Sequence, residues 1–207
     1  MPLPTPAPRE LIHDRRVHCR AYLRKDGLWD IEGHIVDTKT YSFEMGSRGH
    51  IEAGAPIHDM WIRVTCNEAL EIVDVETSMD ARPYNTCTEI LPNFKQLAGV
   101  QMGRGFHRKV RELLGGTAGC THLLELLGPV ATTAFQGIGS MQYRRRRLAG
   151  LPQPRTRPRN LDTCRSWASD GEVVRRNYPE FYTGPEPVER PPAAPVPPLE
   201  PPRDPFG

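Results

Sequence analysis

Hydrophobic and polar residues alternate along the first part of the chain, and this pattern predicts β-strands. Two strand-like runs, residues 18–24 and 28–37, flank an Asp26-Gly27 pair, which predicts a tight β-hairpin. The second run is expected to extend through residues 41–43. Its large hydrophobic residues share one face of the strand, namely Trp29, Ile31 and Ile35.

Two further apolar runs, residues 60–66 and 72–77, predict two more strands. The connection between them, residues 67–70, has the short length typical of antiparallel neighbours. A polar, glycine-rich connection at residues 45–50 separates these strands from the hairpin. We therefore expect one antiparallel sheet with a face left free for helices.

After residue 88 the spacing of apolar residues becomes helical. It predicts a short helix over residues 91–99 and a second helix over residues 105–115, each closed by a glycine. A third helix is predicted to start at about Cys120, and Pro129 is expected to kink or divide it. Strands followed by helices predict an α+β domain with the helices packed on one face of the sheet.

The chain has 207 residues, 38% of them hydrophobic, which is enough for one globular domain with a real core. Proline-rich ends predict disorder at residues 1–14 and 184–207, so the domain is expected over residues 15–183. No apolar run is long enough for a membrane span, and the first residues do not resemble a secretory signal. A cytoplasmic location is therefore expected, and the formal charge of +2 does not by itself indicate a polyanionic partner.

The strongest candidate for chemistry is the glycine-rich segment at residues 115–119, which delivers Cys120 and His122 to the start of the third helix. Free amide groups and the helix dipole at such a position favour a thiolate, which can act as a metal ligand or as a nucleophile. The five cysteines are odd in number and widely scattered, which indicates reduced thiols rather than a disulfide framework.

Two other junctions between predicted elements carry candidate ligands. His58 and Asp59 precede the third strand, and Cys87 lies between the last strand and the first helix. If these junctions meet Cys120 and His122 at one end of the sheet, they can hold zinc or an iron–sulfur cluster. We predict a metal site built from Cys87, Cys120 and His58, with Asp59 or His122 as a further ligand.

The same residues also fit two other classes of protein. In a cysteine-dependent enzyme acting on a small acyl or thioester substrate, Cys120 is the nucleophile and His58 the base. His122 is the weaker base in this scheme, because residues two apart on a helix point to nearly opposite sides. In an adaptor or accessory subunit the cysteines are buried, and the proline-rich tail and the run Arg144–Arg147 contact a protein partner.

Two polar groups have simple structural explanations. Asp30, Glu32 and His34 alternate on one strand face, which suits a small cation or an acid–base pair but is more typical of a solvated face. The arginines at 144–147 complement a helix C-terminus. No aromatic platform or nucleic-acid-binding motif accompanies them, so we do not expect nucleic acid to be the partner.

Three stretches of the sequence resemble an uncharacterised bacterial family, one of the numbered domains of unknown function: residues 26–34, 56–61 and 119–123. This resemblance covers most of residues 15–182 and implies no activity. The order of elements is more distantly similar to the U-type iron–sulfur cluster scaffold proteins. That similarity implies their fold, with His58-Asp59 in place of a Cys-Gly-Asp turn and with Cys87 and Cys120 as the second and third cysteines. The first cysteine of that family is absent here.

Overall fold

The computed structural model describes residues 3–152 and 156–185. Its contacts group the chain into two compact units, Met1–Met141 and Gln142–Gly207, and each is described by itself. All but the first two residues of the predicted tail at 184–207 lie outside the described residues. The predicted domain boundaries at residues 15 and 183 stay predictions.

A four-stranded antiparallel sheet forms the framework of the first unit, with the strand order β1-β2-β5-β6. Its strands are β1 (His13–Leu23), β2 (Trp29–Lys39), β5 (Pro56–Cys66) and β6 (Ile72–Ala81). Two three-residue strands, β3 (Phe43–Met45) and β4 (Gly49–Ile51), form a separate small sheet. The predicted α+β class with an antiparallel sheet is confirmed.

The predicted hairpin joins β1 to β2. Gly27 adopts a φ of 86°, and the Asp26 carboxylate accepts a hydrogen bond of 3.2 Å from the backbone N–H of Leu28. A positive φ is the conformation that favours glycine, which explains the Asp-Gly signal at this turn. The strands differ from the prediction at their far ends, because β1 already begins at His13 and β2 ends at Lys39.

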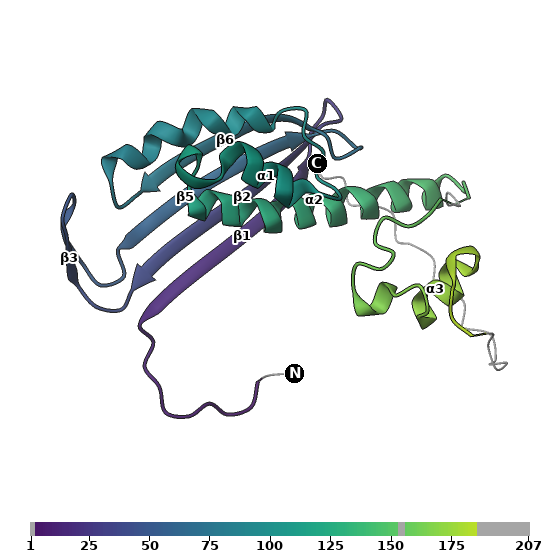
Figure 1. Cartoon of the computed structure of the whole chain (residues 1–207), viewed down its shortest axis with the longest axis horizontal. Helices are drawn as coiled ribbons and strands as arrows, with labels where there is room; N and C mark the ends of the chain where they lie inside the picture. The colour runs from purple at the N-terminus through teal and green to yellow at the C-terminus, as the bar shows by residue number, and fades with distance from the viewer. Residues whose placement is uncertain (1–2, 153–155, 186–207) are drawn as a thin grey trace. The chain divides into compact units, whose positions relative to one another are not determined.

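Helices follow the strands in the first unit: η1 (Asn85–Leu97), α1 (Phe106–Leu114), η2 (Gly116–Ala118) and the part of α2 (Thr121–Leu148) up to Met141. Figure 1 shows α1 and α2 lying across one face of the sheet. Helix α2 is continuous through Pro129, so the predicted division of the helix at this proline is wrong. None of the helices in the described part of the chain combines the length and apolar character that a bilayer crossing requires.

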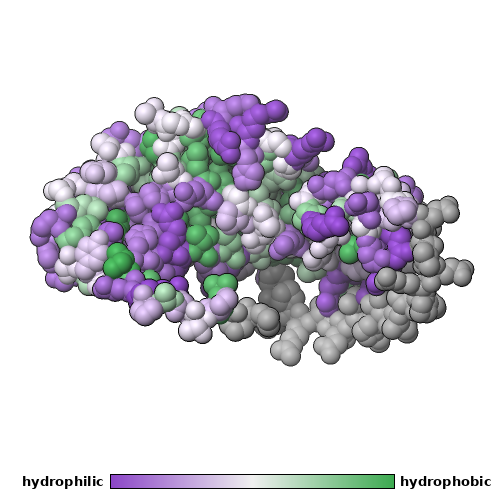
Figure 2. Space-filling model, turned by 60° about the horizontal axis from the view of Figure 1, so that its bottom comes forward, coloured by the Kyte–Doolittle hydropathy of each residue, from purple (hydrophilic) through white to green (hydrophobic). Residues whose placement is uncertain are grey.

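The core lies between the sheet and these helices. On β2 every second residue is buried, and this buried row begins at Trp29 and ends at Asp37. Helix α2 approaches the strand closely at Gly33, where an added Cβ would lie only 2.7 Å from the Val130 side chain. On the face shown in Figure 2, hydrophilic residues surround narrower hydrophobic stripes.

The described part of the second unit contains three short helices: η3 (Arg165–Trp167), α3 (Glu172–Asn177) and η4 (Pro179–Phe181). Val174 is fully buried, and the rings of Trp167 and Tyr178 lie 5.5 Å apart. Aromatic packing therefore helps to order this short segment.

Candidate functional site

Asp37 occupies the last position of the buried row on β2, and none of its surface is exposed to solvent. The guanidinium of Arg15 on β1 donates two hydrogen bonds to it, 2.7 Å from Nε to Oδ1 and 2.9 Å from Nη2 to Oδ2. Burial alone would raise the pKa of Asp37, but Arg15 and a hydrogen bond from His58 lower it to about 2. Asp37 is therefore a buried carboxylate that carries its charge at neutral pH.

Two imidazole rings face the Asp37 carboxylate. His58 lies opposite Asp37 in the register of β2 and β5, and its Nδ1 is 2.8 Å from Asp37 Oδ2. His122 comes from the first turn of α2, and its Nε2 is 3.8 Å from the same oxygen. The centroids of the two rings are 3.7 Å apart. One carboxylate oxygen and two ring nitrogens thus lie close together, with all three ligand atoms within 4.8 Å of one another.

The environment of these histidines favours their neutral form. Burial lowers the pKa of His58, and the neighbouring His122 lowers it further, against the opposing effect of Asp37. Burial also lowers the pKa of His122, and the positive charge of Arg15 lowers it further. Neutral imidazole and ionised carboxylate are the forms that bind metal ions. At neutral pH the three side chains are therefore in the protonation states that bind metal ions.

Arg15 also connects this group to α2, because its Nη1 lies 2.6 Å from the Glu125 carboxylate. The Nε2 atom of His13, the first residue of β1, lies 3.2 Å from Asp37 Oδ1. His13 and Arg15 Nε thus contact Oδ1, whereas Oδ2 accepts from Arg15 Nη2 and faces His58 and His122. Such outer contacts fix the orientation of a ligand and restrict its motion.

Cys120 lies immediately before α2, and its Sγ is 3.9 Å from Nδ1 of His122. The preceding loop leaves no room for a side chain at Gly115 or Gly119. A Cβ on Gly119 would lie 2.2 Å from the Leu114 carbonyl oxygen, and a Cβ on Gly115 would lie 2.4 Å from the Arg111 carbonyl oxygen. The glycine-rich segment therefore holds Cys120 close to the end of α1 and beside His122.

The structure brings together only some of the predicted site residues. His58, His122 and Cys120 lie together, whereas Asp59 is on the opposite face of the sheet, 2.6 Å from Nε2 of His34. Adjacent strand residues point to opposite faces, which explains why His58 and Asp59 separate. Cys87 lies in η1 and packs against the core, and it is not part of the Asp37, His58 and His122 group.

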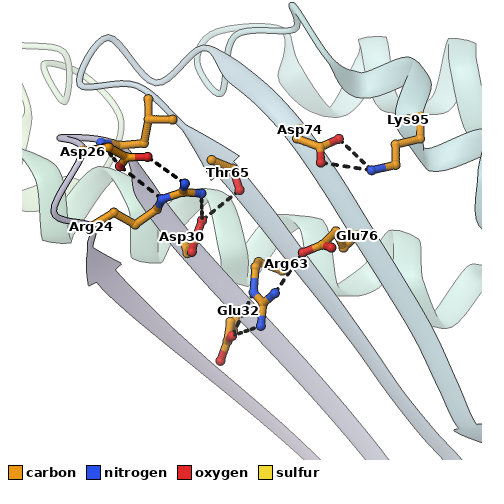
Figure 3. A network of polar contacts seen from close by, with 10 residues as sticks. Arg24, Asp26, Asp30, Glu32, Arg63, Thr65, Asp74, Glu76 and Lys95 are labelled. Carbon is orange, nitrogen blue, oxygen red and sulfur yellow. Dashed lines mark hydrogen bonds and ion pairs between the residues drawn. The ribbon is translucent and has the colours of Figure 1, made fainter.

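The polar residues Asp30, Glu32 and His34 share the face of the sheet that is turned away from the helices. Asp30 accepts a hydrogen bond from Thr65, and Glu32 pairs with Arg63 at 2.8 Å. Figure 3 shows this side, where charged residues of neighbouring strands form ladders across the sheet. The solvated-face interpretation of these residues fits their contacts.

Asp37 is the site residue that sequence reasoning missed. The signal was present, because the alternation that buries Ile31, Gly33 and Ile35 continues to Asp37 and assigns a carboxylate to the core face. A charged residue in such a position is rarely buried without a partner. That partner, Arg15, comes from the neighbouring strand.

The model of the family described as "Protein of unknown function (DUF2889)" matches residues 13–136, so the chain belongs to this family. This confirms the predicted resemblance to a domain of unknown function. No curated protein and no solved structure matches the chain. The comparisons do not show the expected similarity to iron–sulfur scaffold proteins.

Proposed function

We propose that this member of a family without an assigned function binds a divalent transition metal, with zinc as the best match, through Asp37, His58 and His122. One observation carries the proposal: a carboxylate with no exposed surface directs one oxygen at two neighbouring imidazoles. Nitrogen and oxygen ligands of this kind are typical of zinc sites with three protein ligands.

The spacing of the ligand atoms supports a metal between them. Ligands around a tetrahedral zinc ion lie about 3.3 Å from one another, because each bond is roughly 2.0–2.1 Å long. Asp37 Oδ2 is 2.8 Å from His58 Nδ1 and 3.8 Å from His122 Nε2, so the two spacings fall on either side of that value. The third spacing, between the two histidines, is also within 4.8 Å.

Cys120 is the candidate for a fourth ligand. Its Sγ lies next to the His122 ring, and a thiolate is a strong zinc ligand. Iron–sulfur clusters are held mainly by cysteine thiolates. In the described part of the chain a single cysteine, Cys120, adjoins this group, so the ligand set favours zinc over a cluster. Without Cys120 the fourth position is open to water, as in catalytic zinc sites.

The test is zinc titration by calorimetry on chelator-treated full-length protein, together with elemental analysis of the protein as purified. We expect one zinc per chain, and a loss of affinity of at least about ten-fold in His58→Ala and His122→Ala. His50→Ala is the matched control, because His50 is an exposed histidine paired with Glu44 on the small sheet. Equal zinc affinity in all four proteins would refute the site.

A pair of cysteine variants tests the fourth ligand. Cys120→Ser should weaken zinc binding, because it replaces the thiol beside His122 by a poorer zinc ligand. Cys87→Ser should bind zinc as the wild type does, because Cys87 lies in η1 outside the ligand group. Cobalt substitution gives a second readout, since a thiolate ligand adds strong charge-transfer absorption that Cys120→Ser would remove.

A second candidate function is cysteine-dependent catalysis, and one observation favours it. His122 contacts Cys120 Sγ through Nδ1 and faces Asp37 through Nε2, which is the linear order of a Cys–His–Asp triad. Because Cys120 precedes the first helical residue, the two side chains meet even though they are two positions apart. His122 is thus better placed than His58 to act as the base.

Alkylation by iodoacetamide separates the two functions. A catalytic Cys120 should react much faster than the other cysteines at neutral pH in metal-free protein, and His122→Ala should abolish the difference. A zinc ligand should instead be protected when zinc is added. Slow alkylation of Cys120 without metal would refute the catalytic candidate and leave the zinc proposal intact.

A further inference from the structure

A shallow cavity of about 480 Å³, widely open to solvent, lies on the face of the sheet opposite to the helices. Its walls come mainly from β5 and β6, and they include Trp61, Arg63, Glu76, Ser78 and Asp80. This volume is within the range of pockets that hold small organic ligands. The cavity shares none of its lining residues with the Asp37, His58 and His122 group.

The indole of Trp61 forms a rigid wall of this cavity. His34 on β2 stacks against it at 3.7 Å with an interplanar angle of 8°, and Asp59 fixes His34 through a contact of 2.6 Å. On the other side, the register places Ser78 of β6 next to Trp61. Because serine is small, the side of the indole turned away from His34 borders open space.

Acidic groups line the same cavity as the indole. Arg63 holds Glu32 and Glu76 in place with contacts of 2.8 Å, as Figure 3 shows. Asp80 has no hydrogen-bond or ion-pair partner among the residues that the structure describes. The lining therefore contains three carboxylates against one guanidinium, and one of these carboxylates is unpaired.

We propose that this cavity binds a small organic ammonium ion, which packs against Trp61 and faces the carboxylate of Asp80. An aromatic face attracts a cation through its quadrupole, and tryptophan is the best side chain for this purpose. The excess of carboxylates adds long-range attraction for positive charge. A metal ion is the poorer ligand, because these carboxylates do not form a metal-capable group in the described structure.

Titration of the full-length, chelator-treated protein with choline at constant ionic strength tests the proposal. The readouts are calorimetry and the NMR signal of the Trp61 indole N–H, assigned with Trp61→Phe. We expect saturable binding of choline and at least about five-fold weaker binding of dimethylbutanol, the uncharged analogue of choline. Equal binding of the two compounds, or no saturable binding of choline, would overturn the proposal.

Two variants locate the site. Asp80→Asn removes the unpaired carboxylate from an exposed position and should weaken choline binding about three-fold or more without changing stability. Asp74→Asn is the matched control, because Asp74 lies on the same strand outside the cavity lining and pairs with Lys95. Equal choline affinity in Asp80→Asn and wild type would refute the assignment, even if Trp61→Phe fails to fold. His122→Ala should bind choline normally, which separates this proposal from the metal site.

Discussion

At the scale of single residues, Asp37 is a buried carboxylate that Arg15 and His58 keep ionised. Its pKa is about 2 in the folded protein against 3.8 in an ordinary environment. Between these pH values the unfolded chain binds more protons, so the stabilisation is complete above about pH 4–5 and is lost as the pH falls toward 2. The shift corresponds to about 2 kcal/mol of unfolding free energy.

We therefore predict that Asp37→Asn removes this part of the acid dependence. Urea unfolding of metal-free protein between pH 2 and 6 measures it, and the difference between wild type and variant should shrink by about 2 kcal/mol as the pH falls. Asp74→Asn is the control, since Asp74 forms an exposed pair with Lys95 whose loss should change stability by less than about 1 kcal/mol. A pH-independent difference for Asp37→Asn would contradict the assigned pKa.

Part of the candidate site could be predicted from the sequence. Glycines 115, 116 and 119 indicate a tight loop before a helix, and this local signal was sufficient to select Cys120 and His122. The sequence indicates His58 because it precedes an apolar run, although in the structure it lies inside β5. Asp37 and Arg15 were not selected, because their importance depends on the pairing of β1 with β2, which places them side by side. Pairing of this kind is a property of the folded chain.

At the scale of elements, the close approach of α2 to β2 depends on Gly33. An added Cβ there would lie 2.7 Å from Val130 Cγ2 and 3.2 Å from Ile62 Cγ2, both in the core. We predict that Gly33→Ala destabilises the protein by about 1–3 kcal/mol, because the helix must shift to relieve the overlap. Chemical denaturation of the full chain measures this value.

The matched substitution is Gly139→Ala on α2, where an added Cβ meets no atom within 4 Å. It should stabilise the protein by about 0.5–1 kcal/mol, because alanine is a better helix former than glycine. Zinc affinity offers a second readout for Gly33→Ala, since α2 carries His122. Opposite signs for the two variants support the described packing, and destabilisation by both would contradict it.

The elements themselves were largely predictable, and the errors have local causes. The Asp-Gly turn and the apolar alternation identified the hairpin, because both signals act within a few residues. The short strands β3 and β4 were missed, since three-residue strands in a polar, glycine-rich segment leave no periodic pattern. The residues of η1 were predicted only from 91 onward, because Pro92 and its polar neighbours obscure the helical period.

At the scale of the whole molecule, the proposed zinc site belongs to one of two compact units. Its ligands come from β2, β5 and the first turn of α2, which are distant in sequence. A ligand that binds only the folded state stabilises it, by about 2.7 kcal/mol at a free concentration near 100 times Kd. Zinc should therefore stabilise the unit Met1–Met141 as a cooperative body.

Hydrogen exchange measured by mass spectrometry can resolve this effect along the chain. We predict that zinc slows exchange in peptides from β2, β5 and the start of α2, and leaves peptides covering residues 172–181 of the second unit unchanged. His122→Ala should remove the protection, whereas His50→Ala should retain it, because His50 contributes no ligand. Protection restricted to residues 119–123 would indicate a local contact with zinc. Equal protection of both units would mean that zinc acts on the chain in general and not through Asp37, His58 and His122.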